Sequence, residues 1–104
     1  MADFDRHNIA QNLKILESLK VQLLAVTTEL FSGLYRGMDE QVVDALSSAI
    51  IILMSISSRV GISHRRLDRA VEEKLKERIE NPKNSLRDME RELLAFWLGK
   101  GSRQ

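Results

Sequence analysis

The chain has 104 residues, with 16 Lys and Arg against 15 Asp and Glu, no Cys, one Pro and five Gly. This length fits one domain of common size. The net charge of +1 excludes a polyanion-binding tail as the main activity, and the absence of Cys excludes disulfides, thiolate catalysis and Cys-based metal sites. The longest apolar run, residues 49–54, is far shorter than the ~20 residues of a membrane span. No signal-peptide pattern opens the chain, so we expect a soluble, cytoplasmic protein.

Few helix breakers and apolar residues that recur every three or four positions predict helices along the whole chain. We expect a first amphipathic helix over about residues 7–35, which ends at Gly37 because glycine readily adopts a left-handed conformation. Asp39 is the predicted N-cap of a second helix, which we expect over about residues 40–60.

The middle of the second predicted helix is apolar on nearly every side, from Ala49 to Met54. The β-branched residues 50–52 would also suit a strand, but the apolar stripe on both sides of them has helical spacing. A helix that is apolar all round must be covered all round, which a monomer of this size can hardly achieve. We therefore predict a homodimer or homotetramer that is joined through this helix.

A third helix is predicted over about residues 64–80, between Gly61 with Ser63 at its start and Asn81-Pro82 at its end. Ser63 precedes the first helical residue, where a hydroxyl can accept a backbone hydrogen bond. One face of this helix is apolar and the other carries charges of both signs, as expected for a helix with a solvated side.

Ser85 with Asp88 three residues later resembles a capping box, and it predicts the start of a fourth helix. Residues 99–104 are expected to form a flexible C-terminal tail. The chain is therefore predicted to be a single all-α domain over residues 1–98, a four-helix bundle completed by homo-oligomerisation.

A helical hairpin places residues that are equidistant from its turn at the same height. About Gly37, Glu29 mirrors Ala45, and Val26 mirrors Ser48. Each helix thus contributes two positions three residues apart. Such positions share one side of a helix, since a turn takes about 3.6 residues.

This hairpin resembles the MazG-like family of all-α nucleotide pyrophosphohydrolases. In that family one helix carries Glu-x-x-Glu and the next carries Glu-x-x-Asp. The four carboxylates hold Mg²⁺, which positions a nucleoside triphosphate for cleavage to a monophosphate and pyrophosphate. The resemblance covers about residues 19–78, and it rests on Glu29-Leu30, the run 43–53, the corner 59–62 and the segment 70–75.

The resemblance places the four metal-ligand positions at Val26, Glu29, Ala45 and Ser48, where only Glu29 carries a carboxylate. Mg²⁺ takes oxygen ligands in near-octahedral geometry, and valine and alanine side chains supply none. We therefore expect no catalytic residue and no bound cofactor, and leave open whether the chain is an enzyme. The predicted function is an oligomeric module with an eroded metal-binding motif, which binds a nucleotide or another protein without efficient hydrolysis.

A first alternative is an active Mg²⁺-dependent nucleoside triphosphate pyrophosphohydrolase. It keeps Glu29 as a metal ligand and recruits Asp44, Asp39, Glu40 or an acid of a neighbouring subunit. Asp44 lies about 100° around the helix from Ala45. Asp39 and Glu40 also suit a helix N-terminus, which favours negative charge.

A second alternative is a helix-turn-helix DNA-binding protein. Ser57 is a small residue four positions before a turn glycine, and Arg65, Arg66 and Arg69 would begin a recognition helix. However, the preceding predicted helix is long for this motif. Residues 63–104 hold 11 basic and 8 acidic residues, a small excess for binding phosphates. We therefore do not expect nucleic acid as a partner.

Overall fold

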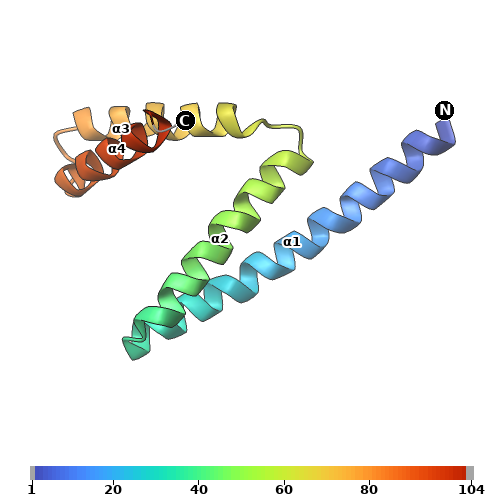
Figure 1. Ribbon diagram of the computed structural model, residues 1–104, viewed down its shortest axis with the longest axis horizontal. Coiled ribbons are helices and arrows are strands. Elements are labelled where there is room, and N and C mark those ends of the chain that lie inside the picture. Colours follow the sequence, from blue (N-terminus) through green and yellow to red (C-terminus); the bar gives the residue numbers. More distant parts are fainter. Residues whose placement is uncertain (1, 103–104) are drawn as a thin grey trace. The chain divides into compact units, whose positions relative to one another are not determined.

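The structure is a computed structural model that describes the backbone of residues 2–102 and the side chains of residues 8–100. Within this part the chain is all-helical, which confirms the predicted all-α class. The helices are α1 (Ala2–Arg36), α2 (Asp39–Arg59), α3 (His64–Glu80) and α4 (Arg87–Ser102) (Figure 1).

The chain divides into two compact units, Met1–Ile62 and Ser63–Gln104. In the first unit α1 packs against α2, and in the second α3 packs against α4. Each unit is therefore a helical hairpin with its own packing. Both the single domain over residues 1–98 and its completion by further copies stay predictions.

The turn between α1 and α2 follows the sequence closely, with one difference. Gly37 has φ +67°, the left-handed conformation expected of a glycine that ends a helix. Met38, not Asp39, is the N-cap residue of α2, so the predicted cap is wrong by one position. Asp39 and Glu40 lie in the first turn instead, where their charge complements the helix dipole.

Gly33 allows α2 to approach α1 closely near this turn. A Cβ atom at Gly33 would lie 3.1 Å from Cγ2 of Val42 and 3.2 Å from Cγ of Gln41. Both distances are short for carbon contacts. Gly33 and Gln41 are each four residues from Gly37, so the two helices have the predicted mirrored register at this end of the hairpin.

The first hairpin buries little of its apolar surface. Ala45 and Ile52 of α2 are buried, whereas Ile50 and Ile51 are 57% and 66% exposed. Large apolar side chains are also exposed along α1, and an apolar surface of this extent commonly marks an interaction site. The other exposed ones in the described part of this hairpin are Ile9, Leu13, Val21, Leu24, Phe31, Leu34, Tyr35, Met38, Val43, Leu46, Leu53, Met54 and Val60.

Of the described helices, α2 alone is long and apolar enough to cross a membrane by length and composition. The same test is passed by helices that are covered by protein, so it is weak evidence for a membrane span. The expectation of a soluble, cytoplasmic protein stays a prediction.

The start of α3 agrees with the sequence. Gly61 has φ +81°, and the side-chain oxygen of Ser63 accepts a hydrogen bond from the backbone N–H of Arg66 at 3.1 Å. Ser63 is the N-cap residue, which confirms that prediction. The preceding corner is held by Ser57, whose buried hydroxyl donates to the carbonyl of Ile62 at 2.9 Å.

The connection between α3 and α4 differs from the prediction. α4 begins at Arg87, so Ser85 is not the residue directly before the helix and the predicted capping box is wrong. The turn is organised by Asn84, whose side-chain Oδ1 accepts from the backbone N–H of Leu86 at 3.0 Å. α4 continues to Ser102, into the segment 99–104 that was predicted to be a flexible tail. Residues 103–104 lie outside the described part.

A buried carboxylate links α3 to α4. Nε of Arg78 is 2.9 Å from both carboxylate oxygens of Glu90, and Nη2 is 2.6 Å from one of them. Asn84 donates to the same carboxylate at 3.1 Å, and Glu90 is only 4% exposed. The hydrogen bonds from Arg78 lower the pKa of Glu90, against the opposing effect of burial. The carboxylate is therefore held ionised inside the second hairpin.

Candidate functional site

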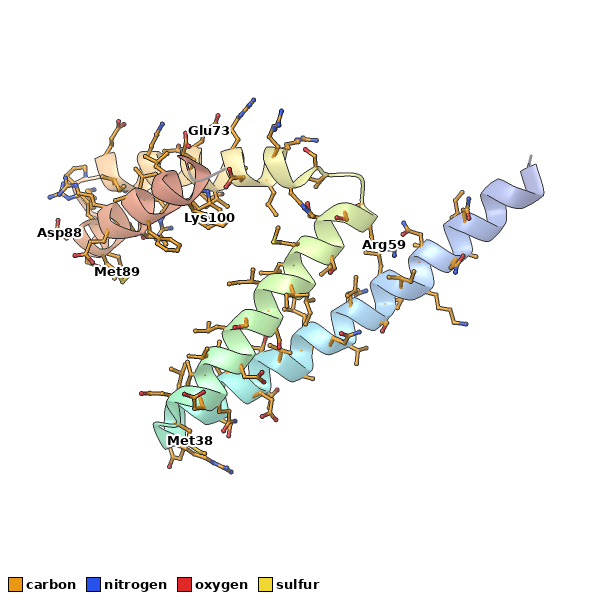
Figure 2. All side chains as sticks on the ribbon, viewed as in Figure 1. Met38, Arg59, Glu73, Asp88, Met89 and Lys100 are labelled. Atoms are coloured by element: carbon orange, nitrogen blue, oxygen red, sulfur yellow. The ribbon has the colours of Figure 1, made fainter. Side chains whose placement is uncertain are left out.

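The four positions that the resemblance marks as metal ligands lie along the α1–α2 hairpin and differ in exposure. Ala45 is only 3% exposed. Val26 and Ser48 are half-buried, and Glu29 is exposed. The single carboxylate thus lies at the surface, while its predicted neighbour on α2 is part of the hairpin core. Figure 2 shows the two ends of α2, marked by Met38 at the turn and Arg59 at the far end.

Glu29 is held by Gln41 of the facing helix. Nε2 of Gln41 donates to the carboxylate Oε2 of Glu29 and to its backbone carbonyl, each at 3.1 Å. An uncharged amide therefore occupies one side of the carboxylate. Gln41 was not among the residues predicted from the sequence, although it mirrors Gly33 about Gly37 and therefore lies at the helix crossing.

The neighbouring acids do not gather around Glu29. Asp39, Glu40 and Asp44 are all exposed, the first two in the first turn of α2. Among the side chains that the structure describes, no group of three or more His, Asp or Glu could hold a metal ion.

The donor set of the four positions does not fit Mg²⁺. Val26 and Ala45 carry no oxygen in their side chains, and Ser48 offers a neutral hydroxyl. Glu29 alone offers a carboxylate, so the four positions supply one anionic ligand to the octahedral set of oxygens that Mg²⁺ demands, instead of the four that the resemblance implies. The arrangement can bind a polar ligand through Glu29 and Gln41, but it lacks the anionic cluster of a metal-dependent hydrolase.

The arginines of the helix-turn-helix alternative lie at the start of α3. Arg65, Arg66 and Arg69 are exposed, and the N-terminus of this helix is capped by Ser63. These side chains belong to the second unit, whereas the positions of the metal motif belong to the first.

Comparison with known proteins supports the family resemblance that the sequence of the α1–α2 hairpin suggested. The model of the family described as MazG-like matches residues 9–92, a range that includes all four mirrored positions and most of both hairpins. No curated protein and no solved structure gives a significant match. Since the matched range covers most of the chain, this protein belongs to the MazG-like family.

Proposed function

We propose that this chain is an oligomeric binding module of the MazG-like family that binds a nucleotide or another protein without efficient hydrolysis. The proposal is carried by the residues Val26, Ala45 and Ser48, which have no carboxylate and occupy three of the four positions that the resemblance assigns to metal ligands. Burial of Ala45 supports it further, because this side chain belongs to the hairpin core and offers no ligand oxygen.

The partner of Glu29 also supports a binding role. In a metal site, ionised carboxylates repel one another and a cation offsets that repulsion. Here Glu29 is bonded to the neutral amide of Gln41, so no cation is needed to stabilise it. An exposed carboxylate beside a half-buried amide can instead hydrogen-bond a base edge or a peptide group of a partner.

Self-association is proposed from the exposed apolar surface of α2. Ile50 and Ile51 are more than half exposed, although they lie in the middle of a helix that is apolar nearly all round. Covering them with a second copy of the same hairpin removes this surface from water, which favours association by roughly 25 cal/mol per Å². We propose a homodimer or homotetramer joined through α2.

A hydrolysis assay tests the catalytic part of the proposal. The full chain, with Mg²⁺, is incubated with a panel of nucleoside triphosphates, and released pyrophosphate is measured for wild type, Glu29→Gln and the control Glu17→Gln. Glu17 is an exposed acid of α1 that pairs with Lys20. We expect equal background rates for all three. Mg²⁺-dependent release by wild type and Glu17→Gln, lost in Glu29→Gln, would instead establish an enzyme.

Sedimentation velocity tests the oligomeric part. We expect wild type to sediment as a dimer or tetramer, and Ile51→Lys to shift the population towards monomer because a charge would enter the apolar contact. Met89→Lys, at an exposed apolar position of α4, is the control and should keep the wild-type species. A monomeric wild type would contradict the proposed assembly.

A further inference from the structure

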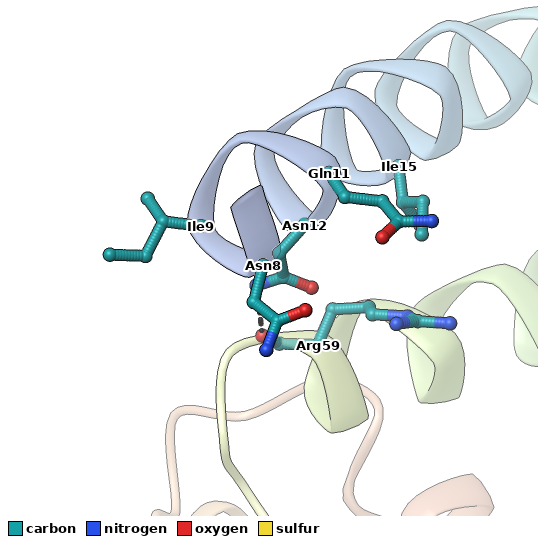
Figure 3. A pocket seen from close by; sticks show the side chains of 6 residues that line it. All are labelled: Asn8, Ile9, Gln11, Asn12, Ile15 and Arg59. Carbon is teal, nitrogen blue, oxygen red and sulfur yellow. Dashed lines mark hydrogen bonds between the residues drawn. The ribbon is translucent and has the colours of Figure 1, made fainter. Parts of the chain in front are cut away.

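A pocket lies at the far end of the first hairpin from the Gly37 turn, between the N-terminal half of α1 and the end of α2. Its volume is about 470 Å³, within the ~300–1,000 Å³ of small-molecule sites. The lining combines one cation, three carboxamides and two isoleucines, contributed by Asn8, Ile9, Gln11, Asn12, Ile15 and Arg59 (Figure 3).

A single hydrogen bond joins the two walls of this pocket. Nδ2 of Asn12 donates to the backbone carbonyl of Arg59 at 2.9 Å, which is the last residue of α2. The bond fixes the backbone of Arg59 beside α1, and the guanidinium extends along the pocket. Figure 3 shows Asn8 above the Arg59 side chain, whereas Ile9 points away from it.

Among the described residues that line the pocket, Arg59 is the only ionisable one. Among the side chains described, no carboxylate lies within ion-pair distance of its guanidinium. A guanidinium offers five N–H donors in a planar fork, and the carboxamides of Asn8 and Gln11 can add more. The pocket therefore presents several N–H donors and one positive charge that no described carboxylate pairs with.

We propose that this pocket binds the phosphate group of a small phosphate monoester. Arg59 binds two phosphate oxygens in a bidentate manner, and the amides of Asn8 and Gln11 donate to the third. A carboxylate, with two oxygens, would leave these amides without an anionic acceptor. The pocket is larger than a phosphate alone, so the organic part of the ester lies against the half-buried Ile15.

This site is independent of the proposed function. Arg59 follows Ser48 by eleven residues, which is about 16 Å along a helix. Neither Glu29 nor the apolar middle of α2 lines the pocket. Phosphate binding here can therefore be present or absent whatever the outcome of the hydrolysis and sedimentation experiments.

Calorimetric titration of the full chain tests the proposal with three probes, which are inorganic phosphate, glycerol phosphate and acetate. We expect glycerol phosphate to bind more tightly than inorganic phosphate, and acetate to bind more weakly than either. Arg59→Gln should weaken phosphate binding at least about tenfold, the loss of one charge-assisted contact, and Arg59→Lys should weaken it less. The control Lys14→Gln removes the same charge from α1 outside the pocket lining and should change binding less than about twofold.

The result can also overturn the proposal. Absence of binding by both phosphate probes would overturn it. Equal losses of phosphate affinity in Arg59→Gln and Lys14→Gln would also overturn it, because equal losses would show a general effect of charge. Acetate binding as tight as that of phosphate would identify a carboxylate site instead. Circular dichroism of each variant confirms that it is folded, and backbone amide shifts of Asn12 and Arg59 in wild type locate the bound probe.

Discussion

Gln41 of α2 donates both to the side-chain carboxylate and to the backbone carbonyl of Glu29 on α1, each at 3.1 Å. One amide nitrogen thus joins the two helices through a pair of residues that are twelve positions apart in sequence. The bond lies beside the close approach at Gly33, where α2 comes near enough that a Cβ would meet Gln41. The carboxylate that the family motif would offer to a metal is therefore part of the contact between the helices.

Gln41→Ala should destabilise the hairpin by about 1 kcal/mol, because the charged acceptor Glu29 loses its donor from α2. Urea denaturation measures the change in the free energy of unfolding. The control is Gln22→Ala, since Gln22 donates to Ser18 within α1 and joins no two helices. Its expected effect is near zero, because alanine also has the higher helix propensity. Equal losses for both variants would contradict a role of Gln41 in joining the helices.

The sequence was sufficient to predict the helices and their glycine turns, because apolar spacing and left-handed glycines are local properties. It also predicted the mirrored register about Gly37 at the turn end of the hairpin, where Gly33 faces Gln41. It missed the partner of Glu29, since a side-chain hydrogen bond depends on how closely two helices cross. In the second hairpin, the ion pair of Arg78 and Glu90 does follow the rule of equal distances from a turn, because each residue is six positions from Asn84.

The caps show where local patterns compete. Asp39 and Ser85 are both good N-cap residues, yet α2 begins at Asp39 itself and α4 begins at Arg87. In the second case the side chain of Asn84 forms the turn before Leu86, and an Asn side chain readily bonds the backbone two residues on. At such positions several residues could cap, and packing selects among them.

Ser63→Ala should destabilise the second hairpin by about 1 kcal/mol, because the backbone N–H of Arg66 loses its acceptor at the start of α3. Ser63→Asp keeps an acceptor oxygen and should remain close to wild type. Fluorescence of Trp97, the only tryptophan of the chain, follows the unfolding of this unit in urea. A wild-type midpoint for Ser63→Ala would show that the cap does not stabilise α3.

Ile52→Ala should destabilise the first hairpin by about 2–4 kcal/mol, because Ile52 is buried and truncation leaves a cavity. Ile51→Ala, next to it but 66% exposed, should have its effect on association instead. Its loss of stability should therefore depend on protein concentration, as expected when folding is linked to assembly. Thermal unfolding at two concentrations distinguishes the two variants.

Glu90 should make the second hairpin sensitive to acid. Its pKa in the folded state is lowered by the hydrogen bonds from Arg78, below the value of about 4.3 for an unfolded glutamate. The unfolded chain therefore binds this proton more readily, and stability rises with pH between the two values. The stabilisation is complete above the unfolded pKa and is lost as the pH falls through the folded one.

Glu90→Gln tests this dependence, because it removes the titrating group while keeping a similar shape. We expect lower stability than wild type at neutral pH, since the guanidinium of Arg78 loses its charged acceptor, and a smaller difference from wild type below about pH 4. Trp97 fluorescence in urea at a series of pH values measures both. Glu92→Gln, at an exposed acid of α4, controls for the general change in charge. A difference between wild type and Glu90→Gln that stays constant down to low pH, or no difference at neutral pH, would show that the ionised carboxylate of Glu90 is not what stabilises the hairpin.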